Sequence, residues 1–239
     1  MPILVGIDGT GGGFAPGASR DRSYDLDFRD SFVRKICNRQ PTARYFRGPL
    51  TLGGGLPEAI DGALSFVNER RRQAPDEPIL MTGYSRGAAG VVVVADRLKS
   101  AGVRVRALML FDCVDRHLAY DAASIPNNVD HVMHVIRDPA ARSRMSFGND
   151  GLRYSPPTQY EPIKKYMCTH GGMGGTPWPV PRGSTSADYI NEGWDEALLS
   201  PTRHEPVWTY RTNVTYAQDR AVSAMVWDDV QPFLTRHKF

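Results

Sequence analysis

Ser85 stands in the segment Gly-Tyr-Ser-Arg-Gly at residues 83–87, a Gly-x-Ser-x-Gly pattern. An apolar run at residues 78–82 precedes it, and a segment rich in alanine and valine follows. Between a strand and a helix, this pattern is typical of a sharp turn that lifts a serine nucleophile above the sheet. The helix that follows would point its positive N-terminal end at the reacting centre. We therefore predict that Ser85 is a nucleophile, the alternative being a structural turn.

A serine hydroxyl needs a base, and the base needs an orienting carboxylate. In hydrolases with such a turn, the acid and then the histidine follow the serine along the chain. His170 stands in the glycine-rich segment Thr-His-Gly-Gly-Met-Gly-Gly at residues 169–175, where a bending backbone would let its imidazole reach Ser85. It is the predicted base. The other histidines lack a glycine context or lie on one predicted strand: His117, His131, His134, His204 and His237.

Three aspartates are candidates for the acid. Asp112 follows the predicted strand at residues 103–111, at the carboxyl end where parallel sheets place functional groups. Asp138 follows the next predicted strand and is the alternative acid. Asp115 is more readily explained as a cap for the segment after it. Position alone does not decide between Asp112 and Asp138.

The first apolar run ends in Gly-Ile-Asp-Gly-Thr-Gly-Gly-Gly at residues 6–13. Backbone amides of Gly9 and Thr10, together with that of Arg86, are the predicted oxyanion hole. One such donor is typically worth about 3 kcal/mol in the transition state. The rival interpretation is a phosphate-binding loop that uses Asp8, but no Walker lysine follows and Ser85 would then go unexplained. Asp8 could also simply hold the loop through hydrogen bonds to its amides.

Composition excludes several classes of function. The 239 residues carry a net charge of +3, and the scattered Lys and Arg residues give no indication of a nucleic-acid partner. Cys37, Cys113 and Cys168 lack metal-ligand spacing and suggest folding under reducing conditions. We expect neither a metal nor an organic cofactor. The N-terminal segment does not resemble a signal peptide, so we expect a protein made in the cytoplasm, with export by a signal-independent route left open.

Short apolar runs alternate with helical patterns along the first 140 residues. This alternation predicts a single α/β domain with a mostly parallel sheet and helices on both faces. The predicted strands cover residues 3–8, 43–47, 78–82, 103–111 and 131–136, and the predicted helices cover residues 25–38, 56–72 and 86–100.

Residues 141–239 read as a loop-rich region that carries His170 and lies over the site. Helical patterns return at residues 187–199 and 217–234. Met173, Trp178 and Val180 could line an acyl pocket, or they could cover the core.

The motifs, taken together, resemble an α/β-hydrolase domain found in type VI secretion phospholipase effectors and related hydrolases. Five features carry the resemblance, in family order over about the first 175 residues. They are Asp-Gly-Thr at residues 8–10, the glycines after the second strand, the Gly-Tyr-Ser-Arg-Gly-Ala turn, Phe-Asp-Cys-Val at residues 111–114, and His170 with its glycines.

The resemblance implies a Ser85–Asp112–His170 triad and an esterase or phospholipase-type activity without a cofactor. It favours Asp112 over Asp138 as the acid. Two departures are Cys113, where the family has Thr, and the lack of an acidic residue soon after His170. An ester or lipid substrate is the implied ligand. The resemblance also suggests that the protein contacts a membrane surface transiently. A secretion-system protein or an immunity protein is a further partner to test. A hydrolase-fold module that binds without catalysis is the alternative.

Overall fold

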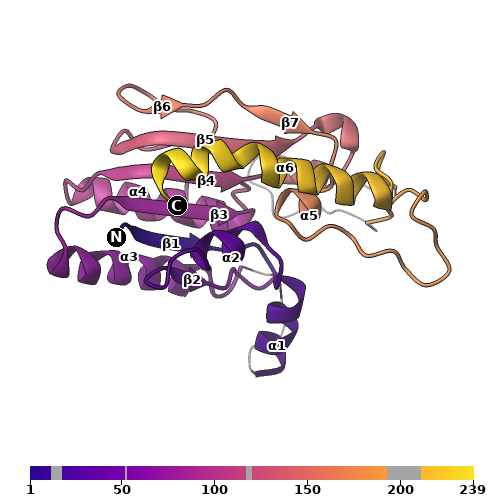
Figure 1. Cartoon of the computed structure of the whole chain (residues 1–239), viewed down its shortest axis with the longest axis horizontal. Coiled ribbons are helices and arrows are strands. Elements are labelled where there is room, and N and C mark those ends of the chain that lie inside the picture. Colours follow the sequence, from indigo (N-terminus) through magenta and orange to yellow (C-terminus); the bar gives the residue numbers. More distant parts are fainter. Residues whose placement is uncertain (12–17, 52, 117–119, 193–210) are drawn as a thin grey trace.

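The computed structural model describes residues 1–11, 18–51, 53–116, 120–192 and 211–239. They form a seven-stranded sheet in the order β2-β1-β3-β4-β5-β6, with β7 also paired to β5 (Figure 1). Every one of these strand pairs is parallel, which confirms the predicted α/β class. The strands are β1 (Ile3–Ile7), β2 (Arg44–Phe46), β3 (Ile79–Tyr84), β4 (Val105–Phe111), β5 (Val129–Arg137), β6 (Gln159–Tyr160) and β7 (Lys164–Tyr166).

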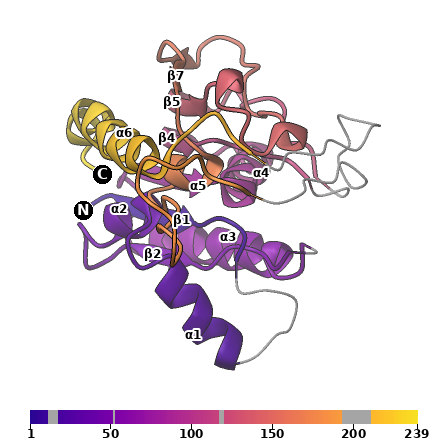
Figure 2. The same cartoon turned by 90° about the vertical axis from the view of Figure 1, so that its right-hand side faces the viewer.

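Helices cover both faces of this sheet. They are α1 (Ala18–Asp27), α2 (Phe32–Cys37), α3 (Leu56–Gln73), α4 (Arg86–Ser100), α5 (His170–Met173) and α6 (Tyr216–His237). Figure 2 shows α2 and α6 on one side of the sheet and α3 and α4 on the other. Side chains alternate along β1 in the same way: Ile3 and Val5 pack with α3 and α4, whereas Leu4 packs with α2 and α6.

The strand order places a topological switch point between β1 and β3. The chain runs from β1 outward to β2, then returns to β3 on the other side of β1. Loops at the carboxyl ends of strands diverge at such a point and leave a crevice. The loop after β1 and the turn after β3 therefore border the same crevice.

The predicted helix at residues 25–38 was wrong as a single element. Ser31 divides it, because its hydroxyl accepts a hydrogen bond from the amide of Arg34 (3.1 Å) and so caps α2. The same hydroxyl donates to Asp8, which fixes the break against the sheet. The first of the two helices, α1, projects from the body of the molecule (Figure 2).

The later part of the chain contributes to the sheet and its cover as well as to loops. Strands β6 and β7 extend the sheet, and α6 matches the helix predicted at residues 217–234. The helix predicted at residues 187–199 is not helical over residues 187–192, where Tyr189 bridges Thr215; residues 193–199 lie outside the described part. None of the described helices is long and apolar enough to cross a membrane.

Candidate active site

Ser85 occupies a sharp turn between β3 and α4. Its backbone has φ 56° and ψ −129°, a conformation that non-glycine residues rarely adopt. Hydrogen bonds to the strand and loop beside it hold it there: its amide donates to the carbonyl of Phe111 (3.0 Å), and its carbonyl accepts from the amide of Val114 (3.2 Å). Strain that the surrounding fold fixes in this way is a feature of functional sites.

The two glycines that flank Ser85 in this turn, Gly83 and Gly87, have a steric role. A Cβ on Gly83 would lie 2.5 Å from Cα of Ala88, inside α4. A Cβ on Gly87 would lie 2.2 Å from the carbonyl oxygen of Asp8. Either side chain would push α4 away from β1 or β3, so the close packing of strand and helix needs glycine at both positions.

The structure brings Ser85, His170 and Asp112 together from three separate segments. The Ser85 Oγ lies 2.8 Å from Nε2 of His170, and Nδ1 of His170 lies 2.6 Å from Oδ2 of Asp112. All three side chains are buried, and Asp112 has no exposed surface. This is the nucleophile–base–acid order that activates a serine hydroxyl.

His170 is the first residue of the short helix α5. Its amide donates to Oγ of Ser143 (2.8 Å), and its carbonyl accepts from the hydroxyl of Tyr84 (2.8 Å). The Phe147 ring lies perpendicular to the imidazole, with the two ring centroids 5.1 Å apart. The glycines after His170 allow close packing, since a Cβ on Gly174 would lie 2.5 Å from the Tyr84 ring. They were expected to let a loop bend; residues 170–173 are helical instead, and Gly175 adopts a left-handed backbone conformation (φ 82°).

Asp112 is held by groups that the sequence did not reveal. Its Oδ1 accepts from Nδ2 of Asn149 (2.6 Å) and from the amide of Arg137 (3.2 Å). Its Oδ2 forms an ion pair of 2.5 Å with Nη1 of Arg137. Arg137 is the last residue of β5, the strand next to the one that Asp112 follows, and strand adjacency was the only signal that could have suggested it.

The other two aspartates have different partners. Asp138 caps the short 3₁₀ helix η1 (Pro139–Ala141), accepting from the amide of Ala140 (2.8 Å). Asp115 accepts from the amide of Ala122 (2.8 Å). Asp112, not Asp138, therefore occupies the position beside the imidazole.

The remaining described histidines serve elsewhere. His134 accepts from the amide of Cys113 (3.0 Å), and the rings of His131 and His237 lie tilted against each other with their centroids 4.5 Å apart. His117 and His204 lie outside the described residues.

Burial and neighbouring charges set the ionisation of the acid and the base. Burial alone would raise the pKa of Asp112, but the Arg137 charge and the hydrogen bond with His170 hold it well below its usual range. Burial lowers the pKa of His170, and the charges of Arg137 and Arg144 lower it further, against the opposing effect of Asp112. The arrangement therefore favours an ionised Asp112 beside a neutral imidazole.

The loop after β1 faces Ser85 across the switch point. The Gly9 amide already donates to the carboxylate of Asp8 (2.9 Å), so it is engaged within its own loop. Among the described residues the amide of Thr10 has no acceptor. The amide of Arg86, first in α4, has no intrahelical acceptor because of its position. Of the three predicted oxyanion donors, Arg86 and Thr10 remain candidates, whereas the Gly9 amide is already bound to Asp8.

Asp8 is buried beneath this loop. Besides Gly9 and Ser31, the hydroxyl of Tyr45 donates to it (3.0 Å). Burial raises its pKa to about 6, against the opposing effect of these hydrogen bonds. Its carboxylate is thus directed at protein donors beneath the loop, which fits the loop-holding role.

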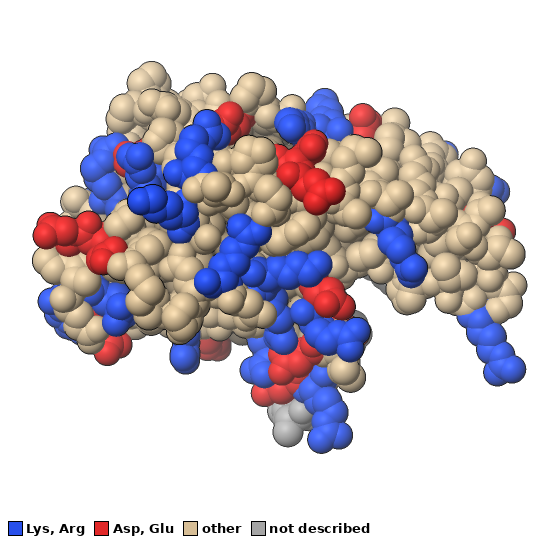
Figure 3. Space-filling model, viewed as in Figure 1, with Lys and Arg blue, Asp and Glu red and all other residues tan. Residues whose placement is uncertain are grey.

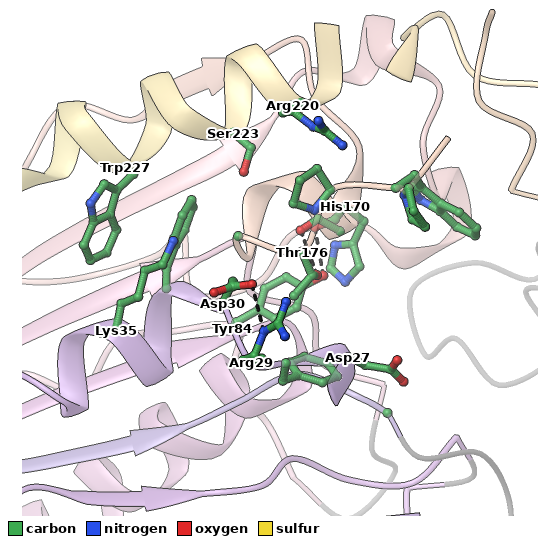
Figure 4. Close-up of a pocket in the computed structure, with 18 of the residues that line it drawn as sticks. Asp27, Arg29, Asp30, Lys35, Tyr84, His170, Thr176, Arg220, Ser223 and Trp227 are labelled. Atoms are coloured by element: carbon green, nitrogen blue, oxygen red, sulfur yellow. Dashed lines mark hydrogen bonds and ion pairs between the residues drawn. The ribbon is translucent and has the colours of Figure 1, made fainter. Parts of the chain in front are cut away.

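A cavity of about 1010 Å³ opens beside His170. Tyr84, Thr176 and Trp227 border it in Figure 4, and Arg220 points toward it from α6. Figure 3 shows the surface notched between α1 and the body of the molecule, with Lys and Arg interspersed among Asp and Glu. Of the predicted pocket residues, Trp178 lines this cavity, Met173 is fully buried in the core, and Val180 is exposed on the following loop.

Within the described part of the chain, no group of three or more His, Cys, Asp or Glu side chains could hold a metal ion. Cys37, Cys113 and Cys168 are free and buried, and burial raises the pKa of each thiol. They have the character of core residues.

No family model matches the chain, and no curated protein matches its sequence. Its structure is distantly similar to solved esterases, thioesterases and lipases. A hormone-sensitive lipase from a metagenome library is 14% identical, with 72% of this chain and 71% of that chain covered and a TM-score of 0.43. The RedJ thioesterase of Streptomyces coelicolor is 13% identical (74% and 85% covered, TM-score 0.41), and an acetyl xylan esterase is 14% identical (98% and 97% covered, TM-score 0.35). Similarity at this level concerns the path of the chain and assigns no activity.

Proposed function

We propose that this protein is a serine esterase that acts through an acyl-enzyme. The observation that carries the proposal is the chain of contacts from Ser85 Oγ to His170 (2.8 Å) and from His170 to Asp112 (2.6 Å), built on the strained turn at Ser85. A neutral imidazole at that distance can accept the serine proton as the oxygen attacks.

The reaction would proceed in two acyl transfers. The Ser85 Oγ attacks the ester carbonyl while Nε2 of His170 takes its proton, and Asp112 stabilises the imidazolium. The amides of Arg86 and Thr10 donate to the oxyanion. The imidazolium then protonates the leaving alcohol. Water, deprotonated by His170, attacks the acyl-enzyme, and Ser85 recovers its proton as the acid leaves.

The finer proposal is a lipid or phospholipid ester as substrate. Apolar side chains of the cavity support it, because Leu26, Trp178 and Trp227 offer surface to an acyl chain. Leu26 is 64% exposed at the cavity and could meet a membrane surface. A secretion-system or immunity protein is the partner that the motif resemblance adds to this proposal.

The test is hydrolysis of a panel of p-nitrophenyl esters and phospholipids by the wild type and by Ser85→Ala. We expect the wild type to be active and Ser85→Ala to lose several orders of magnitude in kcat/KM. The matched control is Ser100→Ala, which changes an exposed serine at the end of α4. A non-catalytic binding module would show no hydrolysis at all, and activity that survives in Ser85→Ala would place the chemistry elsewhere.

A further inference from the structure

Arg137 is a buried arginine whose guanidinium is engaged on every side. Its Nε donates to the carbonyl of Ser143 (3.0 Å), and its Nη2 donates to the carbonyls of Arg144 (3.1 Å) and Gly148 (3.0 Å). Only 6% of its side chain is exposed. Three carbonyls of one loop thus aim the remaining nitrogen, Nη1, at Asp112.

The same carboxylate oxygen of Asp112 meets both Arg137 and His170. Nη1 of Arg137 lies 2.5 Å from Oδ2, and Nδ1 of His170 lies 2.6 Å from it. Nη1 is also only 3.4 Å from Nδ1 of His170. A fixed positive charge at this distance in a buried site opposes a second positive charge on the imidazole. An Arg137–Asp112 ion pair that only stabilised the fold would not need to contact His170.

We propose that Arg137 is a positioning residue that keeps Asp112 ionised and His170 neutral, so that Ser85 is activated at lower pH than it would be without the guanidinium. The inference rests on the proposed esterase function. Arg137 also fixes the loop that carries Ser143, through the three carbonyls that it binds. The Ser143 hydroxyl accepts a hydrogen bond from the backbone amide of His170.

Other charged groups around His170 do not cancel this effect. Arg144 adds a second positive charge, and the carboxylate of Glu192 accepts hydrogen bonds from the Ser143 hydroxyl (2.9 Å) and the Arg144 amide (3.0 Å). The charged and titratable groups that face His170 from the surrounding elements are Asp112 after β4, Arg137 at the end of β5, Arg144 and Glu192 in the following loops, Tyr84 in β3, and Asp219 of α6 beside Thr169.

The sign of the expected change follows from these charges. The pKa of His170 is lowered by burial and by the Arg137 charge, and the pKa of Asp112 is lowered by that charge as well. Removing the cation makes the Asp112–His170 pair bind a proton more readily, whichever of the two residues carries it. The protonated pair cannot act as a base, so activity is lost at a higher pH.

The experiment is the pH dependence of labelling by a fluorophosphonate probe in the wild type, Arg137→Met and Arg137→Lys. For Arg137→Met we expect the acidic limb of the labelling rate to move upward by about one pH unit or more. Arg137→Lys keeps the positive charge, so we expect the acidic limb of its labelling rate to stay at the pH of the wild type. We expect slower labelling, because an ammonium cannot bind the Asp112 oxygen and all three loop carbonyls. The control is Arg97→Met, which breaks a surface ion pair with Asp61.

An acidic limb in Arg137→Met that coincides with that of the wild type would overturn the inference and leave the esterase proposal intact. A wild type that does not react with the probe at any pH would overturn the esterase proposal itself. Because Arg137→Met leaves carbonyls without donors, thermal unfolding checks that the variant is folded. If it is not, NMR titration of His170 in the wild type can still overturn the inference, which requires the pKa of His170 to lie below the ordinary value of about 6.5; a higher pKa would contradict it.

Discussion

The hydroxyl of Tyr84 donates a hydrogen bond of 2.8 Å to the carbonyl oxygen of His170. Tyr84 directly precedes Ser85, so the strand that presents the nucleophile also holds the backbone of the base. The two rings lie 5.1 Å apart. This contact couples two segments that are distant in the sequence, and it makes the position of His170 depend on the end of β3.

Tyr84→Phe removes this hydrogen bond and retains the ring. Because the carbonyl of His170 loses a buried donor, we expect unfolding to cost about 1 kcal/mol less and kcat to fall up to about tenfold. Chemical denaturation and ester hydrolysis measure the two effects. Tyr154→Phe changes an exposed tyrosine as the control. Equal kcat in Tyr84→Phe and the wild type would show that the contact does not position the base.

Gly87→Ala places a methyl group 2.2 Å from the carbonyl oxygen of Asp8. The backbone of β1 cannot move without disturbing the sheet, so we expect a loss of more than about 3 kcal/mol in unfolding free energy, or no folded protein. Gly54→Ala is the matched control, since the new Cβ there has only an ordinary contact of 3.6 Å with Leu50. Similar thermal stability of the two variants would contradict the packing argument.

Arg86→Met tests the loop after β1. The Arg86 guanidinium donates from Nε to Thr10 Oγ1 (2.7 Å) and from Nη2 to the carbonyls of Leu50 (3.1 Å) and Thr51 (2.9 Å). If Thr10 supplies an oxyanion donor, loosening its loop lowers kcat with little change in KM. We expect a loss of about ten- to a hundredfold, since a complete donor is worth about 3 kcal/mol. A variant that changes KM alone would assign Arg86 to substrate binding.

Asp8→Asn tests the buried carboxylate beneath the loop. The pKa of Asp8 is raised to about 6 in the folded protein by burial, above its ordinary 3.8. Its contribution to stability is therefore fully present below pH 3.8 and is lost as pH rises through about 6, by up to roughly 3 kcal/mol. Asparagine does not titrate. We expect the stability of the wild type to fall relative to Asp8→Asn between pH 4 and pH 6, as followed by urea unfolding; a constant difference would mean that Asp8 is not perturbed.

The sequence was sufficient for strands β1 to β5, the turn at Ser85 and the three residues that meet there, but it did not reveal β6 and β7. Hydrophobic runs and glycines around Ser85 are local signals, and the order of Ser85, Asp112 and His170 matched a known pattern. Arg137 was not found, because its role depends on β5 lying beside β4 and on a loop whose carbonyls turn toward it. No local pattern encodes such an arrangement.

Two errors have a similar cause. The helical pattern through residues 25–38 concealed the break at Ser31, whose hydroxyl is fixed by Asp8 from a distant strand. The glycines after His170 suggested a bending loop, although they serve contact with Tyr84 and other neighbours. In both cases the backbone conformation was determined by a tertiary contact, which the local sequence does not show.

The most direct measurement is the site of covalent labelling by a fluorophosphonate, identified by peptide mass spectrometry in the wild type and in His170→Ala. The account predicts a single adduct on Ser85, and a labelling rate at least about a hundredfold lower when His170 is replaced. A native protein that takes up no label, or one whose Ser85 reacts equally fast without the imidazole, would contradict it.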